Sequence, residues 1–190
     1  MSASIIVRID WNENKWEKPS DNLELAGKFE YVKDNNISYT CFNFAHEIYK
    51  PEEDGLWYGL IPAFFSRTPD VDKIRNLSVV FLISNTGGVD YIVGLYAFPK
   101  IGNKKRKILI NEYPTYDLIN IGAEPKNILR FKNYIDLKTL NLRKAIGNQQ
   151  ISTQGWNYIE KENMGYIFDS IQKINPENEK LKQIKFRCLK

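Results

Sequence analysis

The chain has 190 residues, of which 43% are hydrophobic and 13% aromatic, enough for the ring-rich core of one compact domain. Two cysteines and a single histidine exclude a disulfide framework and a structural zinc site. No apolar run is long enough to span a membrane, and the first residues do not form a secretory signal. We therefore expect a cytoplasmic protein without a membrane partner.

The net charge of +4 is unevenly distributed along the chain. Residues 1–60 carry six Lys and Arg against eleven Asp and Glu, whereas residues 61–190 carry twenty-one against twelve. A basic surface that faces a partner is therefore expected in the later part. The densest basic cluster is Lys104, Lys105, Arg106 and Lys107. It fits either a solvated hairpin tip or a phosphate-binding surface.

The first half of the chain predicts few long elements. A β-branched run at residues 4–10 predicts a first, central strand. Residues 24–32 are compatible with a helix or a strand, whereas the aromatic and polar alternation over residues 38–44 predicts a strand with one solvated face. Three prolines between residues 50 and 76 favour loops with at most short helical turns around Trp57.

The second half predicts a meander of three strands, over residues 77–84, 91–98 and 107–111. Apolar residues at three- and four-residue spacing predict a helix from residue 160 to about residue 174. Asn175 and Pro176 then fit the N-cap and first position of a last helix. We expect an α+β domain over residues 1–175, and a helix over residues 176–190 that connects it to an effector domain.

The order and spacing of several short motifs resemble the YTH and EVE domains, which are PUA-like readers of modified nucleotides. The motifs are Ile6-Val-Arg-Ile9, Gly55-Leu56-Trp57, Val93-Gly94, residues 145–149 and residues 154–159. The last motif is also similar to the N-terminal modification-reading domains of some McrB-type restriction systems. The resemblance implies a PUA-like curved mixed sheet or partial β-barrel with flanking helices.

The resemblance also implies a function, the binding of a nucleotide that is flipped out of the stack into a cage of rings. The favoured ligand is N6-methyladenine in double-stranded DNA, read by the targeting module of a modification-dependent restriction system with an NTPase effector domain on the same chain. Stacking on a ring contributes about 1–3 kcal/mol, and the extra methyl group roughly 1 kcal/mol. Neither a catalytic residue nor a metal or cofactor is implied.

The predicted site residues form two groups. Base contacts are assigned to Trp11, Asn12, Trp57, Tyr58, Ser84, Asn85 and Trp156, among which the two Asn and the Ser are candidates for a hydrogen bond to the base edge. Phosphate contacts are assigned to Lys104, Lys105, Arg106, Lys107 and Asn148. Burial in the core is the competing interpretation for Trp57 and Trp156. Trp16 is expected to clamp the surface loop, and His46 to be structural or solvated.

Three other functions stay open. An RNA reader would use the same cage, and a protein-interaction module would expose an apolar patch without a basic rim. Asp117 with Glu124-Pro125-Lys126 fits the loose pattern of a magnesium-dependent nuclease. The chain lacks the motifs of acyl transfer and of nucleotide-cofactor chemistry, so we do not expect an enzyme.

Overall fold

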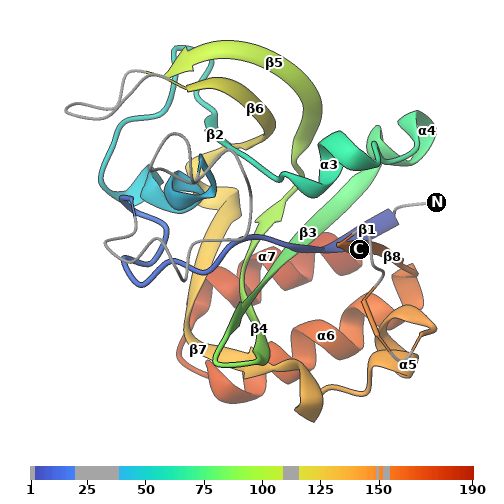
Figure 1. Cartoon of the computed structure of the whole chain (residues 1–190). Coiled ribbons are helices and arrows are strands. Elements are labelled where there is room, and N and C mark those ends of the chain that lie inside the picture. The colour runs from blue at the N-terminus through green and yellow to red at the C-terminus, as the bar shows by residue number, and fades with distance from the viewer. Residues whose placement is uncertain (1–2, 20–38, 109–115, 149, 152–154) are drawn as a thin grey trace.

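The computed structural model describes residues 3–19, 39–108, 116–148, 150–151 and 155–190, which form two open sheets with flanking helices (Figure 1). The larger, mixed sheet has the strand order β7 (Ile128–Asp136), β4 (Val89–Ala97), β3 (Leu77–Thr86), β1 (Ala3–Arg8), β8 (Trp156–Ile159). The smaller sheet has the order β2 (Trp57–Gly59), β6 (Tyr116–Ala123), β5 (Lys100–Ile108). The predicted α+β class is confirmed.

Strand β1 lies inside the larger sheet, as the run at residues 4–10 predicts. It pairs parallel with β3 and antiparallel with β8. Ile5 and Val7 enter one hydrophobic core, and Ile6 enters the other, on the opposite face of the sheet. Both faces are covered, so the strand has no polar alternation.

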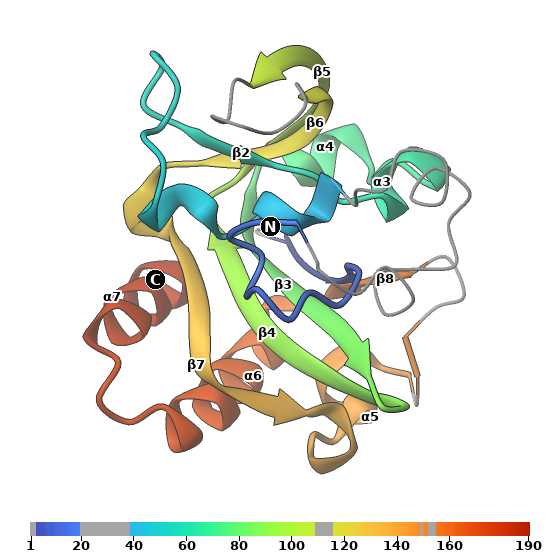
Figure 2. The same ribbon diagram turned by 60° about the vertical axis from the view of Figure 1, so that its left-hand side comes forward.

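Two helices, α6 (Lys161–Ile174) and α7 (Glu179–Leu189), cover one face of the larger sheet (Figures 1 and 2). The helix predicted from apolar spacing is confirmed as α6, whose buried stripe consists of Met164, Ile167, Phe168 and Ile171. None of the helices in the described ranges is long and apolar enough to cross a membrane.

Helix α7 begins later than predicted, because Asn178 is its N-cap and accepts the N–H of Leu181 at 2.9 Å. Asn175 faces the edge of β7 instead. Its amide accepts the N–H of Asn133 at 3.0 Å and donates to the carbonyl of Asn133 at 2.9 Å. These backbone groups of the edge strand are therefore not available for pairing with another strand. α7 buries Leu181 in the same core as α6. A connection to an effector domain stays a prediction.

The opposite face of the larger sheet carries the loop of residues 9–19, the smaller sheet and the turns η1 (Tyr39–Phe42) and η2 (Ala45–Glu47) (Figure 2). The strand predicted over residues 38–44 is wrong in its described part. Residues 40–46 are all buried between the two sheets, so the aromatic side chains pack inside a turn and the polar ones do not form a solvated face.

The basic cluster of residues 104–107 lies within β5 and not at a hairpin tip, which corrects the predicted boundary. β5 starts at Lys100 and pairs antiparallel with β6, with Lys104 opposite Ile119. A strand at the edge of a sheet tolerates lysine well. The other two predicted strands of the meander are confirmed as β3 and β4. Residues 109–111 lie outside the described residues.

The remaining elements are short. They are α3 (Ala63–Ser66), α4 (Val71–Ile74), η3 (Pro125–Asn127), η4 (Leu137–Thr139) and α5 (Leu142–Ile146). The two that fall within residues 50–76, α3 and α4, agree with the loops and short helical turns predicted around Trp57.

Candidate functional site

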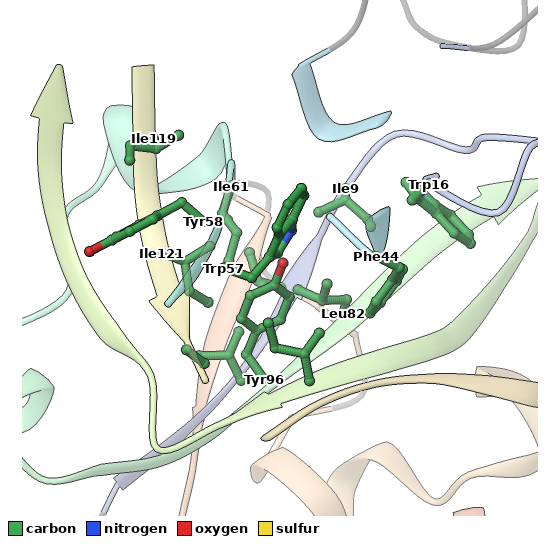
Figure 3. Close-up of a cluster of buried hydrophobic side chains, with 14 of the residues drawn as sticks. Ile9, Trp16, Phe44, Trp57, Tyr58, Ile61, Leu82, Tyr96, Ile119 and Ile121 are labelled. Atoms are coloured by element: carbon green, nitrogen blue, oxygen red, sulfur yellow. The ribbon is translucent and has the colours of Figure 1, made fainter. Parts of the chain in front are cut away.

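Trp57 lies in the core between the two sheets and not at an open pocket (Figure 3). Its side chain is 3% exposed, and the indole Nε1 donates to the carbonyl of Phe42 at 3.1 Å. A base would find almost no ring surface on which to stack. The core interpretation of Trp57 therefore describes this structure, and the predicted cage wall is not formed by this residue.

Gly59 serves packing and does not open a path to a ligand. A Cβ at this position would lie 2.3 Å from Oδ1 of Asn43. The Asn43 amide accepts the N–H of Leu60 at 2.8 Å and donates to the Leu60 carbonyl at 3.0 Å. Asn120 holds the backbone of Ile61 in the same way, with both bonds at 2.8 Å. These two buried amides satisfy the backbone where β2 ends.

Two other glycines make room for buried rings. A Cβ at Gly94 would lie 2.3 Å from the Phe44 ring, and one at Gly122 would lie 2.6 Å from the Tyr58 ring. Tyr58 is 6% exposed, and its hydroxyl donates to the carboxylate of Asp54 at 2.5 Å. The glycine of the Val93-Gly94 motif and the predicted base contact at Tyr58 thus belong to the core.

Trp156 anchors the α3 segment onto the edge strand β8. Its side chain is buried, and its Nε1 donates to the carbonyl of Arg67 at 3.0 Å. The Arg67 guanidinium carbon lies 4.4 Å from the centre of the indole, and the ring of Phe64 meets it edge-on at 6.2 Å. Of the two interpretations of Trp156, the packing role fits these contacts.

Ser84 and Asn85, two predicted contacts to the base edge, hold the end of the larger sheet together. Ser84 is buried and donates to the carbonyl of Ile9 at 3.1 Å. Asn85 is exposed and donates to Asp90 at 2.8 Å. Asp90 also accepts two bonds from the Arg8 guanidinium, at 2.5 and 2.7 Å. Hydrogen bonding to Arg8, above all, lowers the pKa of the Asp90 carboxyl.

Three other rings gather where β1 ends. Trp11 and Trp16 have ring centres 5.6 Å apart, Trp11 and Tyr134 6.0 Å, and Trp16 and Tyr134 6.3 Å. The interplanar angles are 79°, 85° and 69°. Trp16 is fully buried, whereas Trp11 and Tyr134 are half-buried and reach the surface. We call these three side chains the ring cluster.

The loop of residues 9–19 supplies two members of the ring cluster and holds them by its own hydrogen bonds. Asn12 is 3% exposed, donates to the carbonyl of Lys18 at 2.9 Å and accepts the N–H of Trp16 at 3.1 Å. Trp16 Nε1 donates to the carbonyl of Asp10 at 2.8 Å. Lys15 and Trp16 both have left-handed backbone, with φ of 61° and 58°. Each such residue costs about 1–2 kcal/mol.

Strand β7 supplies the third member through a bulge. The register between β4 and β7 shifts at Val93, so that residues 131–134 of β7 lie opposite this single residue of β4. A bulge bends its strand and redirects the side chains within it. Tyr134, the last residue of the bulge, thereby packs against the core on the side of Trp11 and Trp16.

The sequence singles out Trp11 but misses its two partners. Trp16 is expected at the surface and is instead fully buried. Its only local signal is its position five residues after Trp11 in the loop that follows the first strand. Tyr134 carries no local signal, because its orientation depends on the bulge and hence on pairing with β4.

A hollow of about 580 Å³ lies at the same end of the larger sheet as the ring cluster. Its lining includes Arg8, Asp90, Leu137, Lys138, Leu140 and Arg143. Lys138 and Arg143 are exposed, and Lys138 is near enough to Asp90 to contribute to the lowered pKa of that carboxyl. Three cations against one carboxylate make this lining positive, which suits an anionic ligand.

The predicted phosphate contacts are not brought together. Asn148 is exposed after α5, outside the lining of the hollow, whereas residues 104–107 lie on β5 in the smaller sheet. β5 and α5 lie at opposite ends of the molecule in both views (Figures 1 and 2). One contiguous basic surface therefore does not include both groups.

The residues of the nuclease pattern do not converge on a metal. Asp117 is the second residue of β6, and Glu124 follows its last residue. The two are seven residues apart, which is roughly 23 Å along a strand. Glu124 instead pairs with Lys126 at 2.5 Å. Across the described ranges, no three side chains among His, Cys, Asp and Glu are grouped so that they could hold a metal ion.

Comparison with known proteins gives no identification: no protein-family model matches the chain, and no curated protein matches it.

Proposed function

We propose that this chain binds nucleic acid and reads a modified base, with N6-methyladenine in DNA as the favoured ligand. The observation that carries the proposal is the ring cluster: three nearly perpendicular rings within 6.3 Å of one another, two of which reach the surface. Rings that meet edge-on are in contact, so this cluster becomes a cage for a flat group when one of its rings moves aside. The resemblance to YTH and EVE domains and their PUA-like fold supports the same function.

The backbone of the bound strand would pass from the ring cluster around the end of the larger sheet to the hollow, which lies on the other face, where Leu137, Leu140 and Ile151 line it. Arg8 lines the hollow and precedes Trp11 by three residues, so the hollow and the ring cluster share the exit of β1. Lys138 and Arg143 offer two exposed cations there. Phosphate contacts of this kind position a strand without reading its sequence, and the rings then supply the preference for one base.

A base enters the ring cluster only if one ring moves, because the three rings now fill the space between them. The loop of residues 9–19 is suited to this movement. The left-handed backbone of Lys15 and Trp16 destabilises the closed arrangement, so opening of the loop relieves part of this strain. The proposed reader is thus closed in the absence of ligand and opens around a base.

Trp11→Ala tests the base-reading role. If Trp11 stacks on the base, the variant should lose about 1–3 kcal/mol of affinity for methylated DNA, roughly 5- to 150-fold, and little affinity for unmethylated DNA. Affinities for matched methylated and unmethylated duplexes measure the effect. Phe65→Ala is the control, since Phe65 is 43% exposed on α3, away from the ring cluster. A stable Trp11 variant that keeps its full methyl preference contradicts the proposal, as does a native chain with no preference.

A pair of double variants tests the backbone contact. Neutralising Lys138 and Arg143 by glutamine should weaken binding to both duplexes equally and lower the salt dependence by about two units. The same change at Lys104 and Lys105 examines the sequence-predicted surface on β5. The affinities of the two double variants, measured across a series of salt concentrations, give the two slopes to be compared. An unchanged slope for the Lys138 and Arg143 variant, with a reduced slope for the other, would move the phosphate contacts to β5.

A further inference from the structure

A second hollow, of about 540 Å³, lies at the other end of β3 and β4. Its lining includes Arg75, Leu77, Ser78, Phe98, Pro99 and Lys100. Leu77, the first residue of β3, is six residues from Ile83. The carbonyl of Ile83 accepts the N–H of Ile9, just after the end of β1. The separation between Leu77 and Ile83 is roughly 20 Å along a strand. The second hollow is therefore distinct from the ring cluster and from the first hollow.

Phe98 presents its ring to this second hollow by an unusual backbone conformation. It follows the last residue of β4, has φ of 49°, and remains 40% exposed. A bulky residue in the left-handed region is a genuine outlier. The backbone is held there by the N–H of Phe98, which donates to the carbonyl of Ser78 at 2.8 Å, and by the buried Pro99 that follows. The ring is thus kept outside the core.

One cation lies over the Phe98 ring, and two more line the second hollow. The guanidinium carbon of Arg187 lies 5.3 Å from the ring centre, and Arg187 is fixed by a 2.8 Å bond to Asn127. Arg75 and Lys100 are exposed, and neither forms an ion pair with another described residue. The nearby carboxylate of Glu124 is already paired with Lys126. Hydrogen bonding to Lys126, with smaller effects of Arg187 and Lys100, lowers the pKa of Glu124.

We propose that this second hollow binds a nucleotide unit, with the base stacked on Phe98 and the phosphate held by Arg75 and Lys100. Its volume falls within the 300–1,000 Å³ typical of ligand sites. An exposed ring beside free cations is the combination that binds single-stranded nucleic acid regardless of sequence. The nucleotide is either free in solution or part of a strand, since both offer the same base and phosphate.

Phe186 is a matched comparison on the same molecule. Its ring is 62% exposed and carries the Lys190 ammonium at 4.1 Å from its centre. The neighbouring Lys182 and Lys185 are paired with carboxylates, at 2.6 and 2.5 Å. Exposed aromatic surface is therefore common to both places, but two of the three cations beside Phe186 are paired with carboxylates, whereas neither Arg75 nor Lys100 beside Phe98 forms an ion pair with another described residue.

The experiment measures binding of adenosine 5′-monophosphate and of an unmodified 12-nucleotide single strand at low salt. Phe98→Leu should weaken binding of both probes about tenfold. The double variant R75Q/K100Q should weaken both and flatten the salt dependence. Phe186→Leu is the control and should change neither. Because no modified base is present, the outcome does not depend on the proposed base reading.

The two probes separate the sources of the ligand. Equal losses for both support a site for free nucleotides, and a loss confined to the strand supports a second contact along a bound nucleic acid. If Phe98→Leu alters folding, as its melting temperature would reveal, R75Q/K100Q decides the case, since both side chains are exposed. Unchanged binding in the Phe98 and R75Q/K100Q variants, or an equal loss in Phe186→Leu, overturns the proposal.

Discussion

Replacing Trp57 by alanine is expected to destabilise the protein by about 3–5 kcal/mol. The indole is 3% exposed, so its removal leaves a large cavity between the two sheets. The carbonyl of Phe42 also loses its hydrogen-bond donor inside the core. For a chain of this size each kcal/mol lowers the melting temperature by about 2–4 °C, so the variant should melt roughly 10 °C below the native protein.

Two controls distinguish the core role of Trp57 from a ligand-binding role. Trp57→Phe keeps much of the buried ring and should recover most of the lost stability. Trp11→Ala removes a half-buried ring and should cost less stability than Trp57→Ala. A Trp57→Ala variant that melts near the native temperature and has lost its methyl preference would return Trp57 to the base-binding site.

The stability of the protein is expected to fall between pH 6.5 and pH 4 because of His46. The imidazole is 9% exposed, and neither ring nitrogen has a hydrogen-bond partner among the described residues. Burial, with the positive charges of Lys180 and Arg130, lowers the pKa of His46 from 6.5 to about 4. The nearby backbone of Ile128 makes no hydrogen bond of good geometry to the ring, but it favours the protonated form and offsets part of this effect.

A histidine whose pKa is lowered in the folded state destabilises the fold at pH values at which the unfolded chain is protonated. Above pH 6.5 it is neutral in both states, and below that the unfolded chain takes up the proton first. The difference between 6.5 and about 4 corresponds to roughly 3 kcal/mol, which is lost as the pH falls to about 4.

His46→Leu should flatten this part of the pH profile. Denaturant unfolding at several pH values between 7 and 4, for the native chain and the variant, gives the difference caused by His46 while carboxylates titrate alike in both. Leucine also removes two buried nitrogens without partners, so the variant should be at least as stable as the native chain at pH 7. His46 is the single histidine, so its NMR titration reports its pKa directly. A value near 6.5 would contradict the prediction.

Local patterns of the sequence predicted the elements whose surroundings are simple. The β-branched run of β1 and the apolar runs of β3 and β4 are covered on both faces, so their composition alone identifies them as strands. The spacing of apolar residues predicted α6 because one side of this helix packs against the sheet. The α+β class follows from these elements without further information.

The roles of individual polar and aromatic residues were decided by the tertiary structure. Asn175 resembles an N-cap in the sequence, but the edge of β7 takes up its amide. Trp57 between two glycines resembles an exposed wall, but Gly59 is required by the approach of Asn43. Each of these residues satisfies the local pattern equally well in either role.

The ring cluster is the clearest case. Trp11 and Trp16 are five residues apart, but Tyr134 joins them only because a bulge in β7 turns it toward the exit of β1. A bulge depends on register between strands that are distant in sequence. Residue types and their spacing therefore determined which segments form strands and helices, whereas contacts between distant segments decided which rings are core and which reach the surface.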